Sequence, residues 1–93
     1  MPRPRSPKKI CFCPTTTYFK PRGIPLNRIK TIELTQEEVE VLRLKNIENL
    51  DQIQCAKRMK TSQSTIQRIL QTAYKKISIA IIEGMAIKIK NNT

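Results

Sequence analysis

Six hydrogen-bonding side chains lie between residues 62 and 68, in a stretch where Ile66, Ile69 and Leu70 have helical spacing. They are Ser62, Gln63, Ser64, Thr65, Gln67 and Arg68. Glutamine pairs with adenine through two hydrogen bonds and arginine pairs with guanine in the same way, while hydroxyls at the start of a helix bind phosphate together with backbone amides. The alternative is a capped surface helix whose polar face meets only water. The elements around this stretch decide between the two.

Cap residues and apolar spacing predict two helices around this stretch. Ser62 is placed to cap the second helix, of roughly 20 residues, which ends at Gly84. Its apolar positions are 66, 69, 70, 73, 77, 80 and 81. Asp51 is placed to cap the first, over residues 52–59. The inward face expected for that helix consists of Ile53, Cys55, Ala56 and Met59.

The spacing of these two helices is typical of a helix-turn-helix. Ala56 is small enough for the helices to cross closely, and Met59, Ile66 and Ile69 fill the wedge between them. The second helix then protrudes far enough to enter a DNA major groove, about 12 Å wide. Lys60 occupies the turn position that requires positive φ and usually holds glycine, at a cost of about 1 kcal/mol.

The remaining segments predict one more helix and three short strands. Thr35 and Glu38 form a capping box that starts a helix extending to about Asn46. Strands are expected over 10–13, over 31–34 with Ile32 and Leu34 facing inward, and over 86–90. Residues 14–26 are expected to form a loop, anchored by the aromatic pair at positions 18 and 19.

These elements predict a mainly α fold. It has a three-helix core containing the helix-turn-helix, and short β-strands from the N- and C-terminal segments. We expect a basic N-terminal arm and strand-loop segment over 1–34, and a helix-turn-helix domain with a long third helix over 35–84. A C-terminal strand and tail follow over 85–93.

The charge balance favours nucleic acid as the partner. The chain carries 18 basic and 7 acidic residues, a net charge of +11, and its first carboxylate is Glu33. Basic residues expected to flank the groove are Lys57, Arg58, Lys60, Lys75 and Lys76. Arg3 and Arg5 either enter a minor groove or belong to a basic tail that raises affinity without selectivity.

The chain also resembles a known family over nearly its whole length. The resemblance rests on "MPRPR", "YFKPRGIPL", "ELTQEEVEVLRLKNIENLDQIQCAKRM", "SQSTIQRIL" and "EGMAIKI". The family is bacterial and archaeal, is catalogued as domain of unknown function one hundred thirty-four, and is described as predicted DNA-binding. Its central helices are also similar to the helix-turn-helix of region four of bacterial sigma factors. The resemblance implies a transcription regulator that binds double-stranded DNA.

Two departures from this pattern bear on the turn and on the start of the second helix. Lys60 replaces a glycine that is common in the family, and Ser64 stands where a helix-starting proline is often found. The family supplies neither an operator sequence nor a ligand. RNA polymerase is a further candidate partner.

Three other functions are weaker alternatives. Cys11 and Cys13 share one face of a strand, and a dimer would bring two such pairs together in a metal or redox sensor, although two thiols alone do not close a tetrahedral site. RNA binding remains open, but few aromatic residues are present to stack on bases. We expect no enzymatic activity and no cofactor, because the chain has no histidine and no glycine-rich phosphate loop.

Location and oligomeric state follow from the apolar segments. The longest apolar run near the C-terminus is interrupted at Glu83, which makes it too short to span a membrane. We therefore expect a cytoplasmic protein that does not bind a membrane. The distal half of the long helix has apolar residues on nearly all sides, and it includes Ile77, Ile79, Ala80, Ile81 and Ile82. Such a segment needs partners on more than one face, which predicts a homodimer through this region.

Overall fold

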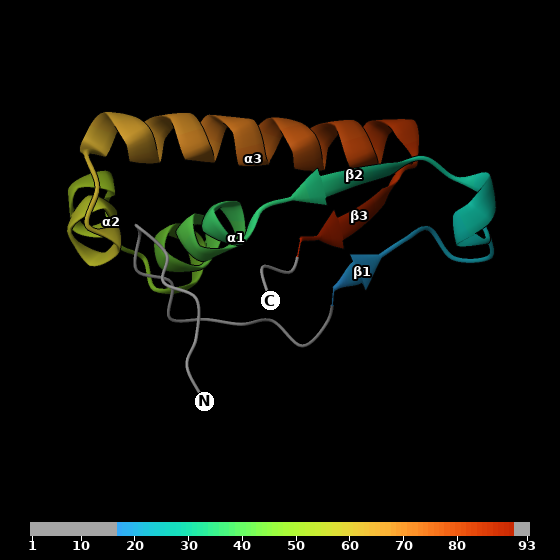
Figure 1. Cartoon of the computed structure of the whole chain (residues 1–93), viewed down its shortest axis with the longest axis horizontal. Coiled ribbons are helices and arrows are strands. Elements are labelled where there is room, and N and C mark those ends of the chain that lie inside the picture. The colour runs from blue at the N-terminus through green and yellow to red at the C-terminus, as the bar shows by residue number, and fades with distance from the viewer. Residues whose placement is uncertain (1–16, 91–93) are drawn as a thin grey trace.

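A long helix spans the molecule in the computed structural model, which describes residues 17–90. This helix, α3 (Gln63–Glu83), has α1 (Gln36–Leu42) and α2 (Gln52–Met59) below its N-terminal half (Figure 1). A small sheet lies below its C-terminal half. The strands of the sheet are β1 (Tyr18–Phe19), β2 (Thr31–Leu34) and β3 (Ala86–Ile89). The expected fold class is therefore confirmed: mainly helical, with short strands from both terminal segments.

Each helix starts at the cap that the sequence predicts. The Thr35 hydroxyl accepts the Glu38 amide at 3.1 Å, and the Glu38 carboxylate accepts the Thr35 amide at 2.8 Å. Asp51 and Gln54 form a second reciprocal pair, at 2.8 and 3.0 Å. The Ser62 hydroxyl accepts the Thr65 amide at 3.2 Å. These bonds satisfy amides that have no partner within the helix, so they fix where α1, α2 and α3 begin.

The first helical segment runs to Ile47, close to the predicted end at about Asn46, but its last turn is not α-helical. Regular α geometry stops at Leu42, and a wider π-helical turn follows over Arg43–Ile47, in which the Glu48 amide donates to the Arg43 carbonyl at 3.0 Å. The Arg43 guanidinium donates to both Glu40 carboxylate oxygens at 3.1 Å and to the Glu48 carboxylate at 3.2 Å. Arg43 thus links the end of the α-helix to the far side of the π turn, a contact that apolar spacing does not reveal.

The main core lies where α1, α2 and α3 meet. Its buried members are Val41, Leu44, Cys55, Ala56, Met59, Ile66 and Leu70. The predicted inward position of Ile53 is wrong, because its side chain is 53% exposed. Two residues correspond to about 200° around a helix, so Ile53 lies nearly opposite Cys55. The face that α2 buries is therefore narrower than predicted.

The sheet has the order β1-β3-β2, with β3 antiparallel to β1 and parallel to β2. Ile32 pairs with Ile87 and Leu34 pairs with Ile89, and all four side chains are buried or half-buried, as predicted for Ile32 and Leu34. Residues 86–89 form the expected last strand. The strand predicted over 10–13 lies outside the described residues.

The predicted loop over 14–26 is interrupted by β1, so that part of the prediction is wrong. Phe19 pairs with Ile87 through the backbone, whereas its side chain is 53% exposed. This segment is held by strand pairing rather than by burial of its aromatic rings. A two-residue strand is too short to show alternation in the sequence, which is why it was missed.

Lys60 adopts the left-handed conformation predicted for the turn between α2 and α3, with φ 57° and ψ 50°. Next to it, the Thr61 amide donates to the Ala56 carbonyl at 2.9 Å, which satisfies a carbonyl at the end of α2. This backbone geometry costs a residue with a Cβ atom about 1 kcal/mol relative to glycine.

Lys60→Gly should therefore raise the free energy of unfolding by about 1 kcal/mol, and the melting temperature by about 4–8 °C. Thermal and urea unfolding measure the change. Lys60→Ala is the matched control, because it removes the same charge but keeps the Cβ atom. An equal gain in both variants would show that charge, not backbone conformation, is responsible.

Candidate nucleic-acid interface

The N-terminal half of α3 presents hydrogen-bonding side chains to solvent. Gln63, Ser64, Gln67 and Arg68, hereafter the polar edge, are all exposed. Opposite Ser64 and Arg68 on the same helix turns, Ile66 and Leu70 are buried in the core. The polar edge therefore projects outward from a helix whose other side is fixed against α2.

Hydroxyl groups surround the first turn of α3. The Ser62 oxygen lies 3.1 Å from the Ser64 oxygen and 2.8 Å from the Thr65 oxygen, while it also caps the helix. Ser62 and Ser64 are exposed and Thr65 is half-buried. This cluster is placed at the positive end of the helix dipole, where a phosphate oxygen is favoured.

A longer polar stripe continues from this edge along α3. Ser64, Arg68, Gln71 and Lys75 are exposed and follow one another at intervals of four, three and four residues. That spacing keeps them on one face over about 16 Å. Sequence reasoning overlooked Gln71, although its position three residues after Arg68 was a sufficient signal.

Basic side chains of α2 and the turn lie beside the start of α3. Lys57, Arg58 and Lys60 are exposed. Lys57 and Arg58 line a shallow hollow of about 280 Å³ together with Leu50 and Gln54. All three cations are within three residues of the turn, so they extend the polar surface toward α2.

Lys76 is placed differently from the other predicted contacts. Its ammonium lies 3.0 Å from the Glu38 carboxylate, which is buried and also caps α1. Because a buried carboxylate needs a compensating charge, this ion pair holds α3 against α1. Lys75, one position away, is exposed. Arg3 and Arg5 lie outside the described residues.

Four carboxylates among the described residues lie close to cations outside the polar stripe. Arg43 binds Glu40 and Glu48, Lys76 binds Glu38, and Lys88 lies 4.0 Å from Glu33. From residue 63 to residue 82, α3 contains no acidic residue at all. The polar stripe therefore has no carboxylate to repel a polyanion.

Comparison with known proteins places this sequence in a family. The profile of the family described as protein of unknown function DUF134 matches residues 1–92. The chain belongs to this family. No solved structure matches it.

Several relatives named UPF0251 protein are similar to the chain. The one from Halothermothrix orenii is 46% identical over 88 residues, which are 95% of this chain and 65% of the relative. The one from Desulforudis audaxviator is 47% identical over 90 residues, which are 97% of this chain and 59% of the relative. The Clostridium botulinum protein is 47% identical over 89 residues, which are 96% of this chain and 57% of the relative. The chain thus spans about three fifths of the length of these relatives.

The described residues contain neither a membrane-spanning helix nor a grouped set of metal ligands. Within residues 17–90, no helix combines the length and apolar character needed to cross a bilayer. Over the part of the chain that the structure describes, no three or more His, Cys, Asp or Glu side chains are grouped to hold a metal ion. Cys11 and Cys13 fall outside that part.

Cys55 lies in the core rather than in a reactive site. The side chain is fully buried, and its sulfur lies 4.0 Å from the Leu50 carbonyl oxygen. Burial raises the pKa of the thiol, and the negative charge of Asp51 adds to this, while Lys45 and Arg58 oppose it. A raised pKa keeps the thiol protonated and poorly nucleophilic near neutral pH.

We therefore expect Cys55 to react with iodoacetamide at pH 8 at least about 100-fold more slowly in the folded protein than in urea. The measurement uses the Cys11→Ser/Cys13→Ser variant, so that Cys55 is the only thiol. The folded state holds this proton more tightly than the unfolded state does. The free energy of unfolding should therefore also fall as the pH rises above the ordinary pKa of a thiol, about 8.5. Equal rates with and without urea would contradict the buried placement.

Proposed function

We propose that this protein binds double-stranded DNA sequence-specifically through α3 and acts as a transcription regulator. The observation that carries the proposal is the polar edge, which is exposed on a helix whose other side is buried against α2. A helix presented in this way fits the DNA major groove, where base edges display distinct patterns of donors and acceptors.

The side chains divide into two roles in this proposal. Gln63, Gln67 and Arg68 contact base edges, since amide and guanidinium groups form paired hydrogen bonds with adenine and guanine. Phosphates are contacted by hydroxyls and ammonium groups around the edge, which position the helix without reading sequence. These residues are Ser62, Ser64, Thr65, Lys57, Arg58, Lys60 and Lys75. Lys76 has a smaller role because of its ion pair with Glu38.

Charge supplies the affinity in this scheme. The net charge of +11 attracts the duplex, and the lack of carboxylates on α3 before Glu83 leaves the polar stripe attractive along its length. Each phosphate neutralised releases counterions, so binding weakens steeply as salt rises. The basic N-terminal arm with Arg3 and Arg5 adds to this dependence in the proposal.

We also expect two copies of the chain to act together, as is common for regulators that recognise two half-sites. A contact with RNA polymerase stays a prediction, because nothing in the described residues singles out a surface for it.

The proposal predicts a specific effect of Arg68. Selection of bound duplexes from a random pool should enrich a short motif, and Arg68→Ala should lose discrimination at one position of it, by about 1–3 kcal/mol. Arg28→Ala is the matched control, since it removes the same charge from the short 3-10 helix Leu26–Arg28, a segment that lies at the end of the molecule opposite α2 (Figure 1). Enrichment of the same motif by both variants would contradict a base-reading role for Arg68.

Lys75 should behave differently from Arg68. Lys75→Ala is expected to weaken all duplexes by a similar factor and to reduce the slope of log affinity against log salt by about one. Titrations of the selected duplex and of a scrambled one, each at several salt concentrations, measure both effects. Tighter binding to a structured RNA than to the selected duplex at equal salt would overturn the proposal in favour of RNA binding.

A further inference from the structure

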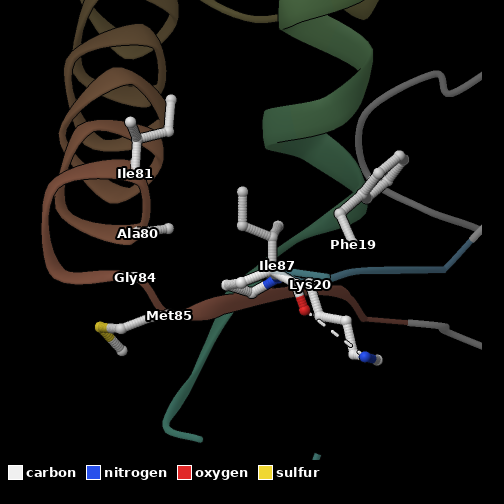
Figure 2. Close-up of a pocket in the computed structure, with 8 residues that line it drawn as sticks. Phe19, Lys20, Ala80, Ile81, Gly84, Met85 and Ile87 are labelled. Carbon is white, nitrogen blue, oxygen red and sulfur yellow. Dashed lines mark hydrogen bonds between the residues drawn. The ribbon is translucent and has the colours of Figure 1, made fainter. Parts of the chain in front are cut away.

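A groove lies beside the C-terminal half of α3, far from the polar edge. Ala80 and Ile81 of α3 form one wall, and Phe19 of β1 forms the other. Ile87 rises between them from β3 (Figure 2). Gly84 and Met85 close the end at which α3 passes into β3. The hollow has a volume of about 220 Å³.

The groove exists because α3 covers only part of the sheet. Side chains alternate between the two faces of a strand, so Phe19, Ile87 and Ile32, which are cross-strand partners, share the face toward α3. The helix packs mainly against β2 and β3, and β1 lies at the edge of the sheet beyond β3. Consequently Phe19 remains 53% exposed.

The opposite wall is also uncovered. Ile81 is 71% exposed, although its position follows the apolar stripe that the sequence predicted to be buried. It lies at the border of that stripe, beyond the part of α3 that the sheet covers. Two large apolar side chains therefore face solvent on either side of one groove, which is typical of a contact surface.

The lining points to an apolar partner rather than to an anion or a small molecule. Lys20 is the charged residue among the lining side chains, and its ammonium turns away from α3 to donate to the carbonyls of Ile24 at 2.9 Å and Pro21 at 3.5 Å. Pockets for drug-sized ligands measure about 300–1,000 Å³, which is larger than this hollow. An apolar protein surface fits better than a free ligand.

The direction of the groove relative to the polar stripe identifies the partner. At about 100° per residue, Ile81 lies about 110° around α3 from the average position of Ser64, Arg68, Gln71 and Lys75. Ile81 thus points sideways from the direction of the stripe. If two copies of the chain are related by a two-fold axis parallel to that direction, Ile81 of the second copy meets the groove of the first. Both stripes then point to the same side of the pair, as binding to one duplex requires.

The spacing along α3 agrees with this arrangement. Arg68 precedes Ile81 by 13 residues, which is about 20 Å along the helix. An axis near Ile81 thus separates the two Arg68 residues by on the order of 40 Å. Neighbouring half-sites on one face of a duplex lie about 34–36 Å apart.

We infer that a second copy of this chain fills the groove, related to the first by a two-fold axis near Ile81. Phe19 and Ile81 of each copy contact those of the other, and the two α3 helices run antiparallel. This choice of partner rests on the proposed DNA binding. Only a protein that binds one duplex with both copies needs the two polar stripes to point in the same direction.

The test is the oligomeric state of the full chain, measured by sedimentation equilibrium at micromolar concentrations without DNA. The wild type should be a dimer, and Ile81→Glu should raise the dimer dissociation constant by about tenfold or more, because it places a charge in an apolar contact. Ile47→Glu is the matched control, since Ile47 is equally exposed, at 73%, but lies in the π turn after α1. Both variants should fold, because neither side chain is buried.

A monomeric wild type, or equal dissociation constants for Ile81→Glu and the wild type, would overturn the inference. A second measurement separates it from the DNA proposal. The wild type should bind two half-sites cooperatively and lose this cooperativity when about 5 bp are inserted between them, while Ile81→Glu keeps its affinity for a single half-site. If Ile81→Glu breaks the dimer but no duplex is selected by either protein, the contact surface stands and the DNA proposal fails.

Discussion

The buried contact between α2 and α3 is the constraint on which the rest of the structure depends. Met59 and Ile66 are fully buried in it, and Ala56 provides the room for the two helices to approach. The chain must turn from α2 into α3 within three residues to make this contact, which is why Lys60 accepts a left-handed conformation. The orientation of the polar edge follows, since Ser64 and Arg68 lie opposite the side on which Ile66 and Leu70 are buried.

One helix carries two surfaces of opposite character. The first half of α3 is polar on its outer side and is backed by α1 and α2, whereas the second half is apolar and rests on the sheet. A single rigid element therefore fixes the distance and the angle between the proposed DNA contact and the groove beside Ile81. Because a helix of 21 residues transmits this geometry directly, no hinge is needed between the two surfaces.

Local signals in the sequence were sufficient for much of this fold. Thr35, Asp51 and Ser62 predicted the helix starts, since a cap involves only residues three positions apart. Contacts between distant residues were not predictable in this way. The ion pair of Lys76 with Glu38 spans 38 positions, and the pairing of Phe19 with Ile87 spans most of the described chain. For the same reason, the polar edge was identified from spacing, whereas the groove could be seen only after the sheet had been placed against α3.

Two ion pairs separate the cations that stabilise the core from those that are exposed to a partner. Glu38 and Glu40 are both buried, and each is bound by a cation, Lys76 and Arg43 respectively. A buried carboxylate without such a partner would be costly, so these two cations serve the stability of the three-helix core. The cations of α2 and of the polar stripe are exposed instead. The two buried pairs each remove one cation and one carboxylate, so they leave the net charge of +11 unchanged. The exposed cations of α2 and the polar stripe remain available to orient a polyanion along α3.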